Sequence, residues 1–318
     1  TFHLVIPCAY KDILPLGDTL FKVSTRNPYI FYFSQRGHQL CAPQYERYGG
    51  FSGGRCAVRR DSLWGFLDEK GREVIACRYE SVRPFSDGMA AVLDSAGWVF
   101  IDTAGVVQFR TQLPRAAGRT FGAFHDGRCP VLRERKWGYW NKAGQLRIPN
   151  LFAAAGSFRF LVAPVKSGQF YGLADTAGQW VVKPEKYALI EEVNAVGLAR
   201  FQEKAQGAWG FMDRTGKVVA AAKYMETDSF QHGYARVRSA KGWGLMNMAG
   251  REVIPCGHYS AIGAVSEGIV AVLPHLSRGQ WVYADTLNRC ISRNTFQQPG
   301  TFQQGYALVE AGRVIDRS

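Results

Sequence analysis

The stretch AWGFMDRTG, residues 208–216, combines residue types that could do chemistry. Asp213 lies between Gly210 and Gly216 and follows Trp209. A carboxylate beside flexible backbone could be a catalytic group. The same residues could instead close a β-turn, because an aspartate accepts local backbone N–H bonds and a glycine supplies positive φ. One copy does not separate these interpretations, but the chain holds many copies.

The pattern recurs along nearly the whole chain. The aspartate position is occupied, at spacings of 31 to 39 residues, by Ser34, Asp68, Asp102, Asn141, Asp175, Asp213, Asn247, Asp285 and Asp316. Six of the eight tryptophans stand four residues before it, at Trp64, Trp98, Trp137, Trp209, Trp243 and Trp281. An enzyme needs one catalytic constellation rather than eight, so the repetition favours turns. In one unit Asn288 replaces the glycine, and asparagine is the residue other than glycine that best tolerates left-handed backbone.

We therefore predict that Asp213 and Gly216 turn the chain. Trp209 is predicted to anchor the incoming strand in the core, and Trp64, Trp137, Trp209 and Trp243 to be mostly buried. After each turn comes a β-branched run such as REVIACRYESV (72–82). It is followed by a phrase such as FQHGYARV (230–237), whose apolar residues alternate as in a half-buried strand. No segment has a sustained helical period, so the expected fold is all-β.

The motifs KWGYWNKAG (136–144) and LWGFLDEKG (63–71) resemble the WG-repeat family, also called KWG repeats. The resemblance covers nearly the whole chain, with its strongest matches in the six central units. It implies a protein found mostly in bacteria and an interaction or scaffold module without assigned chemistry. It supplies no catalytic residues.

The two ends predict a single domain, residues 1–318, of about nine units near 35 residues each. Residues 1–23 read as a second half-unit, and residues 311–318 as a first half-unit that they would complete. Pairing of these segments would give a closed or nearly closed propeller-like toroid of tandem β-repeats and would remove both exposed strand edges. The alternative is an open β-solenoid.

Other catalytic and metal-binding patterns are weak. The six histidines are scattered, and no CxxC pair occurs. Cys256 and His258 are two apart and would share a face if they lay on a strand, but Cys256 stands at a repeated structural position. The segment GGFSGG (49–54) lacks the lysine of a phosphate loop. The sequence thus predicts no enzyme, no catalytic residues, no metal site and no cofactor.

The cysteines and the first residue bear on localisation. Cys8, Cys77 and Cys256 follow similar strands, and Cys56 and Cys129 stand in GRC, which favours small core residues over disulfides or metal ligands. This mildly favours a reducing, cytoplasmic compartment. Because the chain starts at Thr1, a processed secreted or periplasmic form stays an alternative. No run of 18 apolar residues occurs, so no membrane insertion is expected.

Charge is the remaining functional signal. The chain has a net charge of +13, and residues 110–147 carry nine of the basic residues against Asp126 and Glu134. This segment also contains the longest spacing between turns, which predicts an enlarged loop near TQLPRAAGRT (111–120). The residues predicted to bind a partner are Arg110, Arg115, Arg119, Arg133, Arg135 and Lys136. Arg133 and Arg135 are expected to share a strand face, and Lys136 to begin the next strand.

The favoured function is a non-catalytic protein-interaction scaffold whose basic loop face binds an acidic protein partner. Nucleic-acid binding through residues 110–147 is the first alternative, although no nucleic-acid motif accompanies the charge. Binding of cell-wall material or carbohydrate is the second, since the repeats are rich in tryptophan. The single buried-looking register of those tryptophans argues against it.

Overall fold

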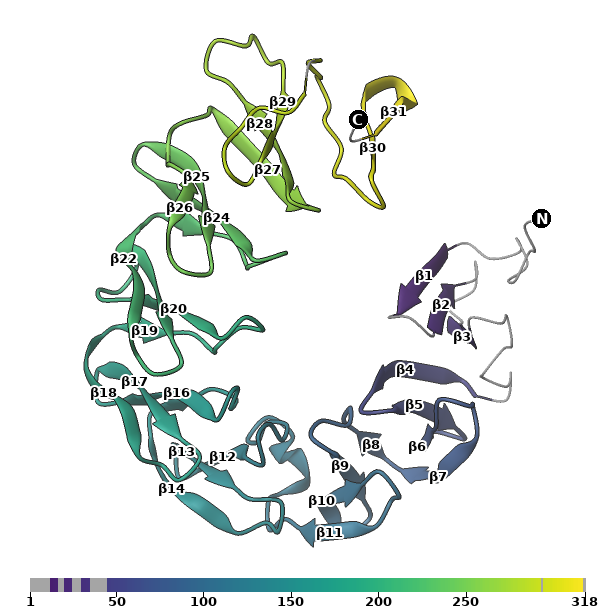
Figure 1. The fold of residues 1–318 in the computed structure, drawn as a ribbon. Helices are drawn as coiled ribbons and strands as arrows, with labels where there is room; N and C mark the ends of the chain where they lie inside the picture. Colours follow the sequence, from purple (N-terminus) through teal and green to yellow (C-terminus); the bar gives the residue numbers. More distant parts are fainter. Residues whose placement is uncertain (1–11, 17–19, 25–29, 35–44, 293, 317–318) are drawn as a thin grey trace. The chain divides into compact units, whose positions relative to one another are not determined.

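The computed structural model describes residues 12–16, 20–24, 30–34, 45–292 and 294–316. The described residues form nine small antiparallel sheets and two short 3-10 helices, so the protein is all-β and built of successive small sheets (Figure 1). This confirms the predicted all-β class with tandem β-repeats. The chain divides into two compact units, Thr1–Leu151 and Phe152–Ser318, and each is described by itself.

Unit 1 contains four of the described sheets, formed by consecutive strands. They are β1 (Asp12–Leu16), β2 (Leu20–Ser24) and β3 (Ile30–Ser34); β4 (Arg47–Ser52), β5 (Arg55–Arg60), β6 (Leu63–Leu67) and β7 (Glu73–Tyr79); β8 (Ser81–Val82), β9 (Met89–Asp94), β10 (Gly97–Asp102) and β11 (Val107–Arg110); β12 (Cys129–Arg133), β13 (Lys136–Trp140) and β14 (Leu146–Phe152). The 3-10 helix η1 (Arg115–Ala117) lies between the last two sheets in sequence.

Unit 2 contains the other five. They are β15 (Ala154–Ala155), β16 (Val162–Ser167), β17 (Phe170–Asp175) and β18 (Trp180–Tyr187); β19 (Leu189–Ile190), β20 (Leu198–Gln202), β21 (Trp209–Asp213) and β22 (Val218–Tyr224); β23 (Glu226–Thr227), β24 (Tyr234–Ser239), β25 (Gly242–Asn247) and β26 (Glu252–Ile254); β27 (Ala261–Ser266), β28 (Ile269–Leu273) and β29 (Val282–Asp285); β30 (Tyr306–Leu308) and β31 (Val314–Asp316). The 3-10 helix η2 (Glu310–Gly312) precedes β31.

The hydrophobic cores lie between neighbouring sheets rather than in one central cluster. In unit 1, one cluster joins Phe66 and Ile75 of the β4–β7 sheet to Val92 and Val99 of the β8–β11 sheet. In unit 2, a similar cluster joins the β19–β22 sheet to the β23–β26 sheet and includes Phe211 and Met246. Within each unit, these neighbouring sheets therefore bury faces against each other, as expected for stacked repeats.

The repeated aspartate closes a turn in every central unit. At Asp213, the carboxylate oxygen Oδ1 accepts the backbone N–H groups of Thr215 and Lys217 at 2.8 and 3.1 Å. The Gly216 N–H donates to the Asp213 carbonyl at 3.0 Å, and Gly216 has φ of +84°. The same pair of side-chain bonds occurs at Asp68, Asp102, Asn141, Asp175, Asn247 and Asp285. Asn288 takes φ of +64° in the glycine place, so the turn prediction is confirmed.

We expect Asp213→Ala to lower the free energy of unfolding by about 0.5–2 kcal/mol, because the backbone N–H groups of the turn lose their acceptor. Burial raises the pKa of the Asp213 carboxyl, but hydrogen bonds from Thr215 and Lys217 outweigh it and hold the pKa below its ordinary value. The carboxylate thus stabilises the fold above the unfolded pKa of 3.8, and this contribution is lost as the pH falls through the folded pKa. Urea unfolding measured across acidic pH checks both effects.

Asp213→Asn is the matched control, since Asn141 and Asn247 make the same turn with an amide oxygen. It should retain most of the stability at neutral pH and lose this part of the acid dependence. Unchanged stability in the alanine variant would contradict the structural role of the aspartate.

The turn glycine also packs against the preceding sheet. A Cβ on Gly250 would lie 2.1 Å from the carbonyl oxygen of Val219 in β22, and one on Gly216 would lie 2.3 Å from Cγ2 of Val182 in β18. In unit 1, Gly144 approaches the Phe109 ring of β11 in the same way. At Gly144, Gly216 and Gly250, glycine therefore serves both the positive φ and the close contact between sheets.

The glycine that follows the motif tryptophan has a different role. A Cβ on Gly65 would lie 2.4 Å from the Ile75 carbonyl oxygen, and one on Gly172 would lie 2.3 Å from that of Val182. Strand pairing shifts register around both glycines, since the outer strand bulges there. The motif glycine thus lets the outer strand's backbone approach the middle strand closely.

The prediction that the motif tryptophans are mostly buried is confirmed, but they do not occupy the centre of the core. Trp64, Trp137, Trp209 and Trp243 are half-buried, with the smaller part of their surface exposed. The fully buried position lies two residues later on the same strand face, at Phe66, Tyr139, Phe211 and Leu245. The tryptophan stands near the start of its strand, where the core ends. In unit 2 its exposed side meets an arginine, as where the Arg200 guanidinium lies 4.6 Å from the Trp209 ring centre.

Four of the five recurring cysteines lie in the predicted structural positions, and Cys8 lies outside the described residues. Cys56 and Cys129 are fully buried, while Cys77 and Cys256 are half-buried. Burial raises the pKa of the Cys129 thiol to about 12, which keeps it protonated and unreactive at neutral pH. The geometry suggested for a Cys256–His258 pair is wrong, because β26 ends at Ile254 and both residues lie in the turn that follows.

The predicted pairing of residues 1–23 with residues 311–318 involves residues 1–11, 17–19 and 317–318, which lie outside the described part of the chain. Whether the repeats form a closed toroid or an open solenoid therefore stays a prediction. Within the described part, β30 and β31 pair antiparallel through Tyr306–Asp316 and Leu308–Val314.

Candidate protein-interaction site

The basic segment, residues 110–147, lies wholly in unit 1 and forms a loop and a sheet. It begins at the end of β11, continues through the loop 111–120 with its helix η1, and ends in the sheet β12–β14. The predicted enlarged loop is thus present. Phe121 pairs with Val131 beside this sheet, and the Leu132 N–H donates to the Thr120 carbonyl at 2.6 Å. The end of the loop is therefore fixed against β12.

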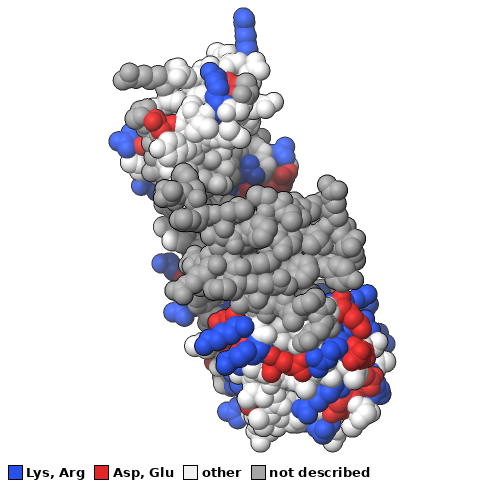
Figure 2. Space-filling view, turned by 90° about the vertical axis from the view of Figure 1, so that its right-hand side faces the viewer, with Lys and Arg blue, Asp and Glu red and all other residues white. Residues whose placement is uncertain are grey.

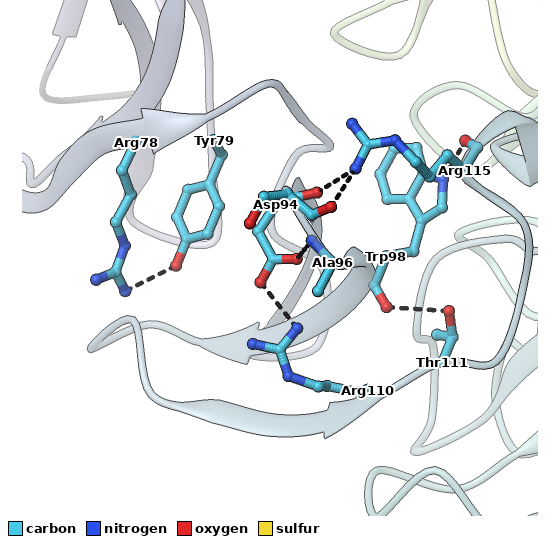
Figure 3. Close-up of polar contacts among 9 residues, drawn as sticks. Arg78, Tyr79, Asp94, Ala96, Trp98, Arg110, Thr111 and Arg115 are labelled. Carbon is cyan, nitrogen blue, oxygen red and sulfur yellow. Dashed lines mark hydrogen bonds and ion pairs between the residues drawn. The ribbon is translucent and has the colours of Figure 1, made fainter.

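The start of the loop is held by Arg115 (Figure 3). Its guanidinium donates to the backbone carbonyls of Asp94 and Ser95 at 2.7 and 2.8 Å and pairs with the Glu80 carboxylate. Its own carbonyl accepts a 2.9 Å hydrogen bond from Nε1 of Trp98, which is buried. Several groups of the β8–β11 sheet thus fix η1 in place.

Arg110 is also engaged within the unit. Its guanidinium lies 2.9 Å from the Asp94 carboxylate, which also accepts the Ala96 N–H at 2.9 Å (Figure 3). Lys142 pairs with Asp87 at 3.0 Å. Carboxylates outside the segment therefore already compensate three of its basic residues. Arg110 and Arg115, both predicted to contact a partner, serve in this structure to hold the loop and β11.

The other predicted residues gather at the tip of the β12–β13 hairpin. Arg133 ends β12 and lies directly opposite Lys136, which begins β13. Glu134 and Arg135 form the two-residue turn, with φ of +49° and +62°. Lys136 therefore begins its strand as predicted. The expectation that Arg133 and Arg135 share a strand face is wrong, because Arg135 has left the strand for the turn.

We define the hairpin-tip cluster as Arg119, Arg133, Arg135 and Lys136. All four side chains are exposed, and no Asp or Glu of the described residues pairs with any of them. Arg133 instead lies over the buried Trp140 ring at 5.7 Å. Arg119 joins the cluster because the neighbouring Thr120 is hydrogen-bonded to Leu132. Glu134 stands between Arg133 and Arg135 in the chain and is not part of the cluster.

The remaining basic residues of the segment lie at the opposite end of the hairpin, near the turn at Asn141. Burial lowers the pKa of Arg128, and the nearby positive charge of Arg147 lowers it further. The charge that looked continuous in sequence thus divides into two groups, separated by the length of β12. The hairpin-tip cluster is the more exposed group.

The β4–β7 sheet provides a contrast in the same unit. In the lower part of Figure 2, where this sheet is seen, Lys and Arg alternate with Asp and Glu. Arg60 pairs with Glu73 at 3.1 Å and Arg72 with Asp68 at 2.7 Å. Interspersed charges of both signs are typical of a solvated surface. The hairpin-tip cluster lacks this compensation.

An open groove of about 610 Å³ lies beside the hairpin-tip cluster. One wall is the loop around η1 and the other is the end of β12; the lining residues are Gln112, Leu113, Pro114, Ala116, Ala117, Thr120, Leu132, Arg133 and Glu134. The Thr120 hydroxyl donates to the Ala117 carbonyl at 2.8 Å, which satisfies the hydroxyl internally. The groove is therefore mostly apolar between two charged residues at one edge.

Sequence reasoning located the segment but missed the groove. The signal was the composition of the long loop, in which Leu113, Pro114, Ala116 and Ala117 stand among the basic residues. The second wall of the groove, at the end of β12, could not be identified from sequence. The hydrogen bond between Thr120 and Leu132 that brings it to the loop joins positions that no local sequence pattern relates.

No helix in the described part of the chain is both long and apolar enough to span a membrane. Likewise, no group of three or more His, Cys, Asp or Glu residues placed to bind a metal occurs among the residues that the structure describes.

Comparison with solved structures supports the fold alone. A crystal structure of a eukaryotic initiation factor is 10% identical, with a TM-score of 0.51, and the match covers 93% of this chain and 89% of that one. Hsv2p of Kluyveromyces lactis is 8% identical with a TM-score of 0.38, over 74% of this chain and 91% of the other.

No curated protein matches the chain in sequence. The WG containing repeat matches at residues 32–64, 64–95, 171–204, 209–240 and 243–273, which together make up half of the chain. These matches contain four of the turns described above, at Asp68, Asp175, Asp213 and Asn247. The chain therefore belongs to the WG-repeat family.

Proposed function

We propose that this protein is a non-catalytic interaction scaffold whose hairpin-tip cluster binds an acidic segment of a protein partner. The observation that carries the proposal is the set of four exposed basic side chains at the tip, none of which has a carboxylate partner among the described residues. An uncompensated positive surface attracts an acidic partner and speeds their association.

The repulsion among these like charges does not favour folding. Arg133 and Lys136 are directly opposed across the β12–β13 ladder, and like charges at such a pair destabilise a hairpin. Arg135 adds a third positive charge in the turn between them. A repulsive group kept at an exposed tip is better explained by attraction to an external anion than by stability.

A protein partner is favoured over nucleic acid on three grounds. Glu134 stands in the turn beside the cluster, and the cluster adjoins an apolar groove, which a phosphate backbone would not fill. Of the nearby tryptophans, Trp98 and Trp140 are buried and Trp137 is half-buried, so none of the three offers a fully exposed ring on which bases could stack. The cluster contains four cationic side chains, which is a small number for a surface that binds along a phosphate backbone.

The proposal is tested with the double variant Arg135→Glu/Lys136→Glu. We expect at least about tenfold weaker binding of a poly-glutamate peptide at low salt, with a reduced salt dependence, since the attraction becomes repulsion. Thermal stability should be kept or raised, because the carboxylate introduced at position 136 would face Arg133 across the ladder. Fluorescence anisotropy and thermal unfolding measure the two effects.

Arg214→Glu/Arg251→Glu is the control, because it makes the same change in net charge at two exposed turn arginines of unit 2. It should leave peptide binding nearly intact. Equal losses in both double variants would show that net charge alone acts. Tighter binding of RNA or duplex DNA than of the peptide, with a steep salt slope, would favour the nucleic-acid alternative.

A further inference from the structure

We infer that the groove beside the hairpin-tip cluster receives one large apolar side chain of the acidic partner segment. This rests on the proposed function and adds a specificity element to it. The expected recognition motif is an extended acidic peptide with a single Leu, Met or aromatic residue among its carboxylates. Charge complementarity with the hairpin-tip cluster selects this occupant over a neutral one.

The groove is held open by its own framework. Arg115 and Trp98 fix η1, and the Leu132–Thr120 hydrogen bond fixes the loop to the opposite wall. A site that is already formed loses little conformational freedom when it binds, so more of the contact energy appears as affinity. The walls therefore act as a rigid receptor.

The lining suits an apolar group. Leu113, Pro114, Ala116 and Leu132 present carbon atoms, and Ala117 is buried at the base. The Thr120 hydroxyl is occupied by the Ala117 carbonyl, so it offers no free donor to a polar ligand. A polar side chain placed against these carbon atoms would lose hydration without regaining its hydrogen bonds.

The two charged lining residues fix where the partner's carboxylates must lie. Arg133 borders the groove and would attract a carboxylate next to the apolar anchor, whereas Glu134 would repel one placed on its side. Arg119 and Lys136 extend the positive charge beyond the rim. An anchor with acidic neighbours therefore fits better than either an anchor or acidic residues alone.

The test uses an acidic peptide array in which one central position is varied through all amino acids. The wild-type protein should prefer Leu, Met, Phe or Trp over Ser or Gly at that position by about tenfold. Ala116→Trp should fill the groove without changing charge and abolish this preference, while binding of the Ser peptide persists. Ala143→Trp, at an exposed turn position at the other end of the hairpin, should keep the preference.

Circular dichroism and the thermal midpoint show whether the variants fold. If Ala116→Trp does not fold, Gln112→Trp replaces it, because Gln112 is an exposed residue of the same wall. A flat profile in the wild type, with binding still lost in Arg135→Glu/Lys136→Glu, would overturn this inference and leave the proposed function standing. Absence of binding to every acidic peptide would overturn both. Wild-type self-association that Ala116→Trp removes would assign the groove to a second copy instead.

Discussion

Gly250→Ala should destabilise the protein far more than Gly233→Ala, although the two glycines have φ of +78° and +85°. A left-handed alanine costs about 1–2 kcal/mol at either position. At Gly233 the added Cβ would meet nothing within 4 Å, whereas at Gly250 it would lie 2.1 Å from the Val219 carbonyl oxygen. We expect the Gly250 variant to lose more than about 3 kcal/mol of unfolding free energy, because backbone must move to admit the methyl group.

Urea unfolding of both variants measures the difference in their unfolding free energies. Because both variants have the same backbone strain, this difference reports the packing between sheets. Similar losses would mean that the turn needs glycine for its φ alone. Gly216→Ala is an intermediate case, since the nearest atom is the movable Cγ2 of Val182. It should fall between the other two.

Phe211→Ala should lower the free energy of unfolding by about 3–5 kcal/mol, a loss larger than that of Trp209→Ala. Phe211 is fully buried and lies edge-on to Phe230 at 5.5 Å, so its removal leaves a cavity. Trp209 is half-buried, and the stem of Arg200 can cover part of the space that it leaves. Chemical denaturation monitored by circular dichroism gives both values without relying on tryptophan fluorescence.

Leu245→Ala and Trp243→Ala repeat the comparison one sheet later, where Leu245 is fully buried and Trp243 is half-buried. A larger loss for the tryptophan in both sheets would restore the original expectation that the motif aromatic carries the core.

The aspartate turns could be predicted from sequence because all their determinants are local. Asp213 and Gly216 are three residues apart, and the bonds that they make depend only on the residues between and just after them. Asn288 showed in advance that the position needs positive φ. The strands were equally accessible, since alternation and turns both repeat along the chain.

The errors came from features that depend on distant contacts. Residues 209 and 211 share a strand face, so alternation alone could not show which one occupies the centre of the core. The turn at Glu134 and Arg135 contains no glycine, so its positive φ values left no signal in the sequence. The compensation of Arg110 by Asp94 and of Arg115 by Glu80 joins residues 16 and 35 positions apart.

The contact between a turn glycine and the preceding sheet gives the chain a direction during synthesis. Gly250 rests on β22 and Gly216 on β18, so in both cases the supporting strand is the one that leaves the ribosome earlier. Each new turn can dock onto a surface that is already complete, which suits N-terminal-first folding. Within a unit, loss of a later sheet exposes one face, whereas loss of an earlier sheet removes the support on which the next turn closes.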